Sequence, residues 1–200
     1  MIERENIADT AIEQVSGILS IQLFTPEQCR TIIDEAEHLN TWVPGKIQGS
    51  REGDDITWVV SPEIRDALIM GLHELPVTSK LFDDKIRSTI LPIVNRRWKM
   101  ELTDHSGAQV IRYTPGGHYK PHIDNEPGID DRHFSIVCYL NDDVEGGSTD
   151  FPVLGFSSSP RTGKAIIFPS EYLHCSQPII SGRKYILVTW LIGAIPVSWI

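Results

Sequence analysis

The alternation of apolar and polar residues predicts a strand and then a helix near the start of the chain. Residues 16–24, SGILSIQLF, alternate as a strand does, because successive side chains of a strand point to opposite faces. Thr25 is a suitable N-cap for the helix that follows, with Pro26 at its first position and Gln28 completing a capping box. The helix would bury one apolar stripe, formed by Ile32, Ile33, Ala36 and Leu39.

The next part of the chain has weaker patterns. Residues 40–55 are rich in glycine and proline and are expected to form a loop, and ITWVV at 56–60 predicts a short strand. The sequence Ser61-Pro62-Glu63 predicts the start of a second helix that runs to about Leu75.

A third helix is expected over residues 79–98. Pro92 lies inside it and is expected to kink it, because proline cannot donate a backbone hydrogen bond.

From residue 107 onward the pattern changes to short β-rich runs, QVIRY, HFSIVCYL, KAIIF and KYILVTWLI. Turn-forming segments separate them, among them TPGG, VEGG and SPRTG. Strands at this spacing are typical of a β-sandwich or a jelly roll. We therefore expect a mainly β fold with the helices on one outer face. Residues 1–200 would be a single domain, helix-rich to about 106, with a jelly-roll core over 107–192.

Composition and charge narrow the classes of function. The 200 residues, 40% hydrophobic and 22% charged, suit one globular domain. The formal net charge is −9, and no run of Lys or Arg exceeds two residues. Such a surface repels phosphate backbones, so no nucleic-acid partner is expected.

The cysteines and the N-terminal residues bear on location. Cys29, Cys138 and Cys175 are widely spaced and form no CxxC pair, so neither a disulfide framework nor a thiolate zinc site is indicated. Cys29 and Cys138 are expected to be core residues, and a reducing cytoplasmic setting follows. The first residues, MIERENIADTAIEQ, lack the features of a signal peptide, and no apolar run approaches the ~20 residues that a membrane span needs.

A possible metal site lies in TPGGHYKPHIDN, residues 114–125. His122 and Asp124 are two residues apart, so on an extended strand their side chains reach the same side. His174, in a short segment before the last β-rich run, is the best candidate for a second histidine. Two histidines and one carboxylate on one face of a metal leave positions open, which favours non-haem Fe(II) and O₂ chemistry over structural zinc.

Three blocks of sequence carry a family resemblance: RYTPGGHYKPHID (112–124), CYLNDDVEGGSTDFP (138–152) and HCSQPIISGRKYILVTW (174–190). In order and spacing they resemble the prolyl-4-hydroxylase-like branch of the 2-oxoglutarate/Fe(II) oxygenases. The segment FTPEQCRTIIDEAE (24–37) is also similar to that family. The resemblance covers roughly residues 16–192 and is weakest over 40–106.

The resemblance implies a double-stranded β-helix, a cupin-like jelly roll. It also implies Fe(II) bound by His122, Asp124 and His174, with 2-oxoglutarate and O₂ as cosubstrates and ascorbate as a possible reductant. In this family a basic residue of the last strand pairs with the far carboxylate of 2-oxoglutarate. Lys184 stands six residues before Trp190 and ten after His174, as the family pattern requires. Lys184 is therefore preferred, with Arg183 as the alternative that a one-residue bulge would select.

Other residues are assigned by the same resemblance or discounted. Tyr113 and Tyr139 stand where the family places tyrosines that hydrogen-bond this carboxylate, and Thr149 and Thr189 are weaker candidates for the same pocket. His118 lies four residues before His122, but the prolines and glycines around it argue against the helix that this spacing would need for a shared metal.

Three further residues are expected to have structural roles. His133 is expected to be structural or to lie at the pocket rim. Gly146 and Gly147 are expected in a tight turn.

The sequence leaves the substrate open. The segments 40–55, 125–132 and 153–160 could frame the mouth of a site, and Trp42, Arg51 and Trp58 could contact a substrate. The leading hypothesis is a hydroxylase of a peptidyl or free amino-acid side chain. The alternatives are an oxygenase acting on another small metabolite and a non-catalytic cupin-type binding module. The same module class includes sugar epimerases, and demethylation of nucleic acid is disfavoured by the acidic charge.

Overall fold

The β-rich runs of the second half form one sheet, to which the first half also contributes. The computed structural model describes residues 11–52, 55–125 and 131–193, and its main sheet has eight strands. All neighbouring pairs are antiparallel. In order across the sheet the strands are β1 (Ile12–Val15), β2 (Ile18–Gln22), β14 (Lys164–Pro169), β10 (Arg132–Tyr139), β17 (Lys184–Ile192), β8 (Asp104–Tyr113), β7 (Leu68–Gly71) and β3 (Val43–Pro44).

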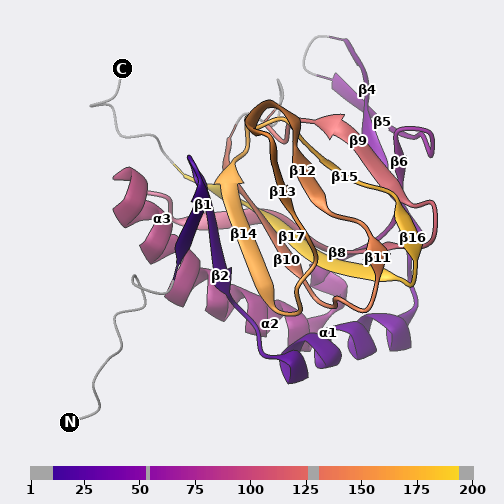
Figure 1. The fold of residues 1–200 in the computed structure, drawn as a ribbon, viewed down its shortest axis with the longest axis horizontal. Coiled ribbons are helices and arrows are strands. Elements are labelled where there is room, and N and C mark those ends of the chain that lie inside the picture. Colours follow the sequence, from indigo (N-terminus) through magenta and orange to yellow (C-terminus); the bar gives the residue numbers. More distant parts are fainter. Residues whose placement is uncertain (1–10, 53–54, 126–130, 194–200) are drawn as a thin grey trace.

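A second sheet lies over one face of the main sheet (Figure 1). Its five strands, in order, are β13 (Phe156–Ser158), β12 (Thr149–Phe151), β15 (His174–Ser176), β9 (His118–His122) and β6 (Arg65–Asp66). Two strand pairs extend the structure, β11 (Glu145–Gly146) with β16 (Ile179–Ser181), and β4 (Lys46–Glu52) with β5 (Asp55–Val60). Two facing antiparallel sheets are the jelly-roll arrangement that the sequence pattern predicts.

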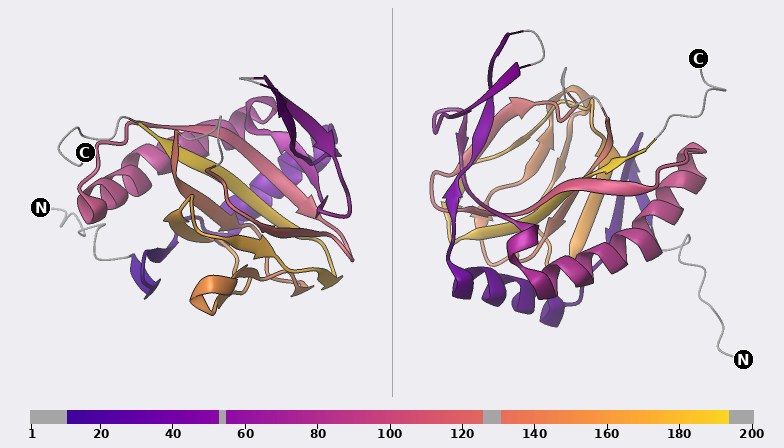
Figure 2. Two further views of the ribbon diagram at one scale, coloured as in Figure 1. Left: turned by 90° about the horizontal axis from the view of Figure 1, so that it is seen from above. Right: turned by 180° about the vertical axis from the view of Figure 1, so that it is seen from behind.

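The helices cover the other face of the main sheet (Figure 2). They are α1 (Pro26–Leu39), α2 (Pro76–Lys85), the π-helical turn η3 (Ile86–Ile90) and α3 (Leu91–Trp98). Two short 3₁₀ turns, η2 (Leu72–Glu74) and η4 (Pro152–Leu154), complete the described elements. None of the helices in the described residues is long and apolar enough to cross a membrane.

Side-chain alternation in the central strands divides the core into two layers. In β10, Ile136 and Cys138 pack with the helices, whereas Val137 and Tyr139 pack between the two sheets. Adjacent residues of a strand point to opposite faces, so one strand supplies both layers. The β12 residue Phe151 meets Phe168 of β14 edge to face, with ring centroids 4.8 Å apart, which joins the two sheets.

Helix α1 begins as the sequence predicts. The hydroxyl of Thr25 accepts a hydrogen bond from the backbone N–H of Gln28, and the Gln28 side chain accepts one from the Thr25 N–H, which forms the capping box. Cys29, Ile32 and Ala36 are buried, so Cys29 is the core residue that the pattern suggested. Leu39, expected on the same stripe, is exposed.

Two predictions for the middle of the chain are wrong. The expected loop at 40–55 contains β3 and most of the hairpin β4–β5. The glycines in this segment led to the loop prediction. The expected helix from Ser61 to Leu75 is a turn followed by β6, β7 and η2. Ser61 does start a turn, since its carbonyl accepts hydrogen bonds from the Ile64 and Arg65 N–H groups, but β7 then pairs with β8. Sheet pairing provides tertiary contacts that override the local helix signal.

The third helix begins earlier than predicted and contains a defect near its proline. It starts at Pro76, three residues before the expected position, and ends at Trp98 as expected. Within it the N–H of Leu91 donates to the carbonyl of Ile86, five residues back, so a π turn precedes Pro92. Proline removes one backbone donor from the helix, and a π turn is a usual way to accommodate such an interruption.

Candidate active site

The register of two strands brings the predicted metal-binding residues together. Strands β9 and β15 pair antiparallel with His122 opposite His174, and the two imidazole centroids are 4.3 Å apart. Asp124 lies two residues beyond the end of β9, and its carboxylate joins the same cluster. One ligand atom from each of the three residues lies within 4.8 Å of the others. Side chains from distant parts of the chain therefore converge on one point between the sheets.

Backbone carbonyls orient both imidazole rings. The Nδ1 atom of His122 lies 2.8 Å from the Lys120 carbonyl oxygen, and Nδ1 of His174 lies 2.9 Å from that of Tyr172. A carbonyl only accepts, so each Nδ1 carries the proton and each Nε2 presents a lone pair. The two Nε2 atoms lie 3.6 and 3.5 Å from the Asp124 carboxylate oxygens.

The Asp124 carboxylate is held as an anion. Burial by itself would raise its pKa, but the two histidines and a hydrogen bond from Ser135 outweigh burial and lower the pKa of Asp124 well below its usual range. The Ser135 hydroxyl donates to Oδ2 at 2.7 Å and also contacts the Ser170 hydroxyl at 2.9 Å. Burial lowers the pKa of His174 to about 4, so its ring is neutral at neutral pH.

These three residues fit an Fe(II) ion. Neutral imidazoles and an ionised carboxylate are the ligand forms that a divalent metal requires. Their hydrogen-bonded outer atoms match the arrangement in which metal-binding histidines donate their second N–H to a carbonyl. Two histidines and one carboxylate on one side of an ion, with open positions opposite, select non-haem Fe(II).

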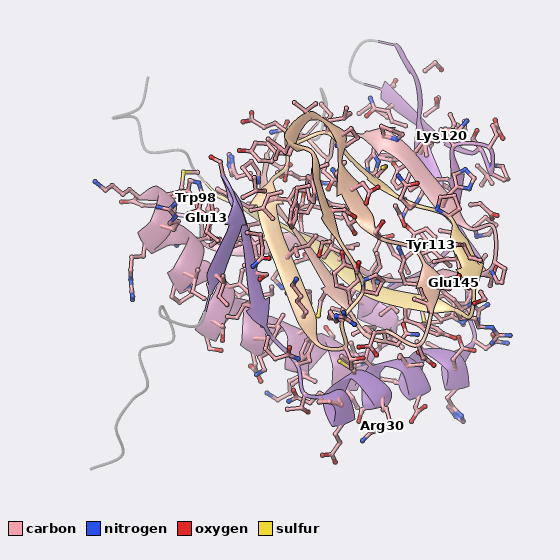
Figure 3. All side chains as sticks on the ribbon, viewed as in Figure 1. Glu13, Arg30, Trp98, Tyr113, Lys120 and Glu145 are labelled. Carbon is pink, nitrogen blue, oxygen red and sulfur yellow. The ribbon has the colours of Figure 1, made fainter. Side chains whose placement is uncertain are left out.

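The metal-binding residues face a cavity of about 350 Å³ between the sheets. Apolar side chains of β8 and β17 form part of its wall, among them Ile111, Ile186 and Val188. Gln48 and Trp58 of the hairpin β4–β5 also line it. In Figure 3, Lys120 of β9 lies at the same end of the molecule as this hairpin, whereas Arg30 of α1 lies at the opposite end.

Lys184 is completely buried and does not itself line the cavity. Its Nζ atom donates to the Ser176 hydroxyl at 2.6 Å and to the Gly147 carbonyl at 2.7 Å, and it lies 4.5 Å from the Tyr113 ring centroid. Ser176 and Tyr113 line the cavity, so the ammonium stands directly behind its wall. Burial lowers the pKa of Lys184 to about 7, and attraction to Asp150, which is not within ion-pair distance, offsets this only in part.

The other residues expected in this pocket differ in their access to it. Tyr113 lines the cavity, and burial raises the pKa of its hydroxyl. Tyr139 does not line it, and its hydroxyl is bonded to Thr149 and to the Ser158 carbonyl. Thr149 does line the cavity, so Tyr139 can act on a bound ligand only through Thr149. Arg183 directly precedes β17 and is exposed.

Some discounted or weaker residues lie outside the cavity. Thr189 is bonded to His105 and to the Ser106 carbonyl instead. His118 contacts the Gly116 carbonyl through Nδ1, and His133 contacts the Gly193 carbonyl through Nε2, so both have structural partners. Trp42 packs on the helix side of the main sheet, 6.4 Å from the Tyr185 ring.

The three segments that were expected to frame the mouth of the site differ in what they contribute to the cavity. The 40–55 segment contributes Lys46, Ile47 and Gln48 to the cavity wall. In the segment 125–132, residues 126–130 lie outside the described residues, and Arg132 lines the cavity. No residue of 153–160, all of which are described, lines it. The side chain of Arg51 lies outside the described part of the chain.

Sequence reasoning missed several residues of this cavity. Ser135 is a polar residue on the same face of β10 as Val137 and Tyr139, and this parity was a usable signal. Gln109 likewise shares a face of β8 with Ile111 and Tyr113. Arg132 was covered only as the last residue of the expected mouth segment 125–132. Arg65 gave no signal, because only the fold brings β6 to the edge of β9.

Comparison with known protein families shows which family the second half of the chain matches. Residues 108–192 match the family model described as the 2OG-Fe(II) oxygenase superfamily. This segment belongs to that superfamily. The match confirms the resemblance on which the expected ligands rest, and it spans both metal-binding strands and β17. Fe(II), 2-oxoglutarate and O₂ are the reactants that the superfamily implies, and the His122, Asp124 and His174 cluster fits the iron.

Individual relatives of this 2OG-Fe(II) oxygenase segment include prolyl hydroxylases. The prolyl 4-hydroxylase subunit alpha-1 of Gallus gallus is 34% identical over 111 residues, which are 46% of this chain and 22% of that protein. A PKHD-type hydroxylase of Synechococcus sp. (strain CC9605) is 34% identical over 88 residues, 41% of this chain and 40% of that protein. The chain thus spans less than half the length of these relatives.

Solved structures confirm the double-stranded β-helix fold. The viral collagen prolyl hydroxylase of Paramecium Bursaria Chlorella virus-1 has a TM-score of 0.67 at 22% identity, covering 89% of this chain and 97% of that one. A prolyl hydroxylase of Trichoplax adhaerens, in complex with a hypoxia inducible factor peptide fragment, has a TM-score of 0.67 at 16% identity and covers 93% and 89%.

Proposed function

We propose that this protein is an Fe(II)- and 2-oxoglutarate-dependent dioxygenase that hydroxylates a C–H bond of a peptidyl or free amino-acid side chain. The observation that carries the proposal is the cluster of His122, Asp124 and His174, which faces a cavity large enough for small ligands. When bound, iron(II) and 2-oxoglutarate supply the oxidising chemistry, in which O₂ is consumed and succinate, CO₂ and hydroxylated product are formed. Ascorbate would serve as an auxiliary reductant.

The protein's own side chains would hold these reactants in place. His122, Asp124 and His174 bind the iron, and their hydrogen bonds to backbone carbonyls and to Ser135 keep the ligand atoms aimed at one point. Lys184 pairs with the far carboxylate of 2-oxoglutarate at the inner end of the cavity. This assignment requires Ser176 or the Gly147 carbonyl to yield one of its present bonds with the ammonium.

Three further features support the Lys184 assignment. Tyr113 lines the same cavity, and its hydroxyl contacts the side chain of Ser176, the residue that Lys184 also contacts. Thr149 lies beside it, with its hydroxyl oriented by Tyr139. The apolar residues Ile111, Ile186 and Val188 keep the intervening wall dry, which strengthens the ionic contacts.

The cysteines and the net charge support proposals for the cellular location and the class of substrate. All three cysteines are free and buried, which suits the reducing cytoplasm that we propose as its location. The acidic charge supports a protein or small-molecule substrate over nucleic acid. We propose no membrane partner.

Anaerobic titration with Fe(II) and 2-oxoglutarate tests the proposal. Chelation of iron by 2-oxoglutarate produces a weak visible charge-transfer band, which is expected in the wild-type protein and absent in His174→Ala. His118→Ala is the matched control, because it removes the same side chain from β9 without touching the cluster, and it should retain the band. Absence of the band in the wild-type protein would favour a binding module instead.

Turnover distinguishes the substrate classes. Succinate formation is measured with proline-rich peptides, free amino acids and other small metabolites. Stimulation by peptides or amino acids supports the proposal, and stimulation only by a metabolite of another class contradicts its substrate assignment.

A further inference from the structure

Two arginines line the cavity beyond the metal-binding residues. Arg65 comes from β6 and Arg132 from the start of β10. Among the described residues, no carboxylate lies within ion-pair distance of either guanidinium. Other arginines of the fold, such as Arg87 and Arg112, do have such partners. Unpaired arginines in a partly enclosed space are uncommon, because burial of an uncompensated charge is costly.

Aromatic rings hold both guanidinium groups in position. Arg132 lies 3.6 Å from the Trp190 ring centroid, and Arg65 lies 4.9 Å from that of Tyr119. Arg65 also donates from Nη1 to the Lys46 carbonyl at 3.0 Å, while its Nε atom is buried without a hydrogen-bond partner. The groups are thus fixed before any ligand binds and still have donors to offer, as a preorganised anion site requires.

The charge of the loaded site leaves these arginines uncompensated. Iron(II) and Lys184 together carry as much positive charge as Asp124 and 2-oxoglutarate carry negative charge. Arg65 and Arg132 stand outside this balance and add positive charge to the cavity lining. Burial and, to a smaller extent, repulsion from Arg65 lower the pKa of Arg132, while attraction to Asp124 and Asp131 offsets part of this effect. A bound anion would relieve both the burial cost and the mutual repulsion.

Arg132 donates from Nη1 to the Asp124 carbonyl at 3.5 Å, but several neutral groups of the same cavity lack hydrogen-bond partners. The side-chain oxygens of Gln48 and Gln109 and the indole N–H of Trp190 are buried without hydrogen bonds, and all three residues line the same cavity. Buried polar atoms are nearly always satisfied in folded proteins, so a set of orphans in one cavity indicates a polar ligand. The glutamine oxygens can accept hydrogen bonds from an ammonium group.

We propose that the substrate is a free amino acid whose carboxylate is bound by Arg65 and Arg132 and whose ammonium group faces the oxygens of Gln48 and Gln109. This inference rests on the proposed oxygenase function and narrows its substrate class. The cavity volume of about 350 Å³ is at the low end for ligand sites and must hold 2-oxoglutarate as well, which suits a small substrate. An internal peptide segment has neither the carboxylate nor the ammonium group.

Matched pairs of probes test the proposal. A panel of the common free L-amino acids is compared with the corresponding amino-acid amides, which keep the ammonium group but lose the carboxylate. A proline-rich peptide with blocked ends and no acidic side chain is the third probe. The anaerobic charge-transfer band with Fe(II) and 2-oxoglutarate reports binding, and succinate formation reports turnover. At least one free amino acid should perturb the band and stimulate turnover at a concentration roughly tenfold or more below that of its amide.

Variants assign the carboxylate contact to the arginines. In Arg65→Gln and Arg132→Gln the band formed with 2-oxoglutarate should remain, which shows that the protein is folded and loaded. The concentration of amino acid needed for half-maximal turnover should rise roughly tenfold or more. Arg132→Lys, which keeps the charge, should recover part of the loss. Arg161→Gln removes an exposed arginine from a turn outside the cavity and should change neither quantity.

Three results would overturn the inference while leaving the oxygenase function intact. These are equal responses to amino acids and their amides, no response to any free amino acid, and a stronger response to the blocked peptide than to every free amino acid. A wild-type protein that forms no band with Fe(II) and 2-oxoglutarate would instead remove the proposed function, and this inference with it.

Discussion

His122 and His174 are direct partners across the antiparallel pair β9–β15, although one comes from the middle of the chain and the other from near its end. Their rings lie on the same side because residues directly opposite each other in a sheet share a face. A slip of one residue in this register would turn one ring to the opposite side. Register is thus the structural feature on which metal binding depends.

Removal of the Ser135 hydroxyl should weaken iron binding without unfolding the protein. The hydroxyl donates to Asp124 Oδ2 at 2.7 Å and so fixes the carboxylate. Loss of such an outer contact usually lowers metal affinity about 10- to 100-fold. We expect Ser135→Ala to fall in that range in an anaerobic Fe(II) titration. Ser88→Ala, which removes an exposed hydroxyl on η3, should bind iron as the wild type does.

Binding of 2-oxoglutarate should weaken as pH rises above about 7. The pKa of Lys184 is lowered to about 7 by burial, so the ammonium that pairs with the carboxylate becomes scarce at higher pH. Binding at pH 8 should therefore take up a proton. Anaerobic calorimetry in two buffers with different ionisation enthalpies measures this uptake, and an affinity that stays constant from pH 7 to 9 would contradict the assignment.

The same lysine should make stability depend on pH in the metal-free protein. Its folded-state pKa of about 7 lies below the ordinary value of 10.5, so between these values the unfolded chain binds more protons. The free energy of unfolding should therefore rise with pH across that window. Lys184→Met should lose this rise and the affinity for 2-oxoglutarate, whereas Arg183→Met, on the exposed side, should retain both in urea unfolding and titration.

Substitution of Gly107 should disturb Trp190, on which Arg132 rests. Gly107 has a φ of +64°, and an added Cβ would lie 2.8 Å from the indole ring. We expect Gly107→Ala to lower the free energy of unfolding by about 1–3 kcal/mol, through backbone strain and overpacking together. Gly155→Ala provides the matched control, because its φ is +60° with nothing within 4 Å. Equal losses in urea denaturation would show that the Trp190 contact contributes nothing.

Glu37 should matter for stability alone. It accepts hydrogen bonds from Arg112 at 2.6 Å and from the Tyr185 hydroxyl at 3.1 Å, and so joins α1 to the main sheet. Glu37→Ala leaves Arg112 without its carboxylate, and we expect a loss of about 1–3 kcal/mol in thermal or urea unfolding. Asp34→Ala, exposed on the same helix, should stay within about 0.5 kcal/mol. A loss of the 2-oxoglutarate band in folded Glu37→Ala would contradict a purely structural role.

Local sequence patterns correctly predicted features that depend only on residues close together in the chain. The capping box at Thr25 needs only neighbours in the chain, and it forms as expected. The parity of β17 placed Lys184 with Ile186 and Val188, and the structure has these residues on the inner side. By contrast, Ser61 to Leu75 carries a helix-start signal, yet β7 forms there because β8 offers an edge to pair with.

The sequence alone was enough for the class of fold and for the three candidate metal ligands that the structure brings together. Strand periodicity, the HxD spacing and the position of His174 are local features, and a family resemblance joined them. Only the tertiary structure decided which other side chains line the cavity beside these three residues. Four of them come from separate strands, and no regular sequence spacing relates them: Arg65, Arg132, Gln48 and Gln109. Their juxtaposition follows from the pairing of β6 with β9 and from the position of the hairpin β4–β5, and these are non-local contacts that no window of sequence contains.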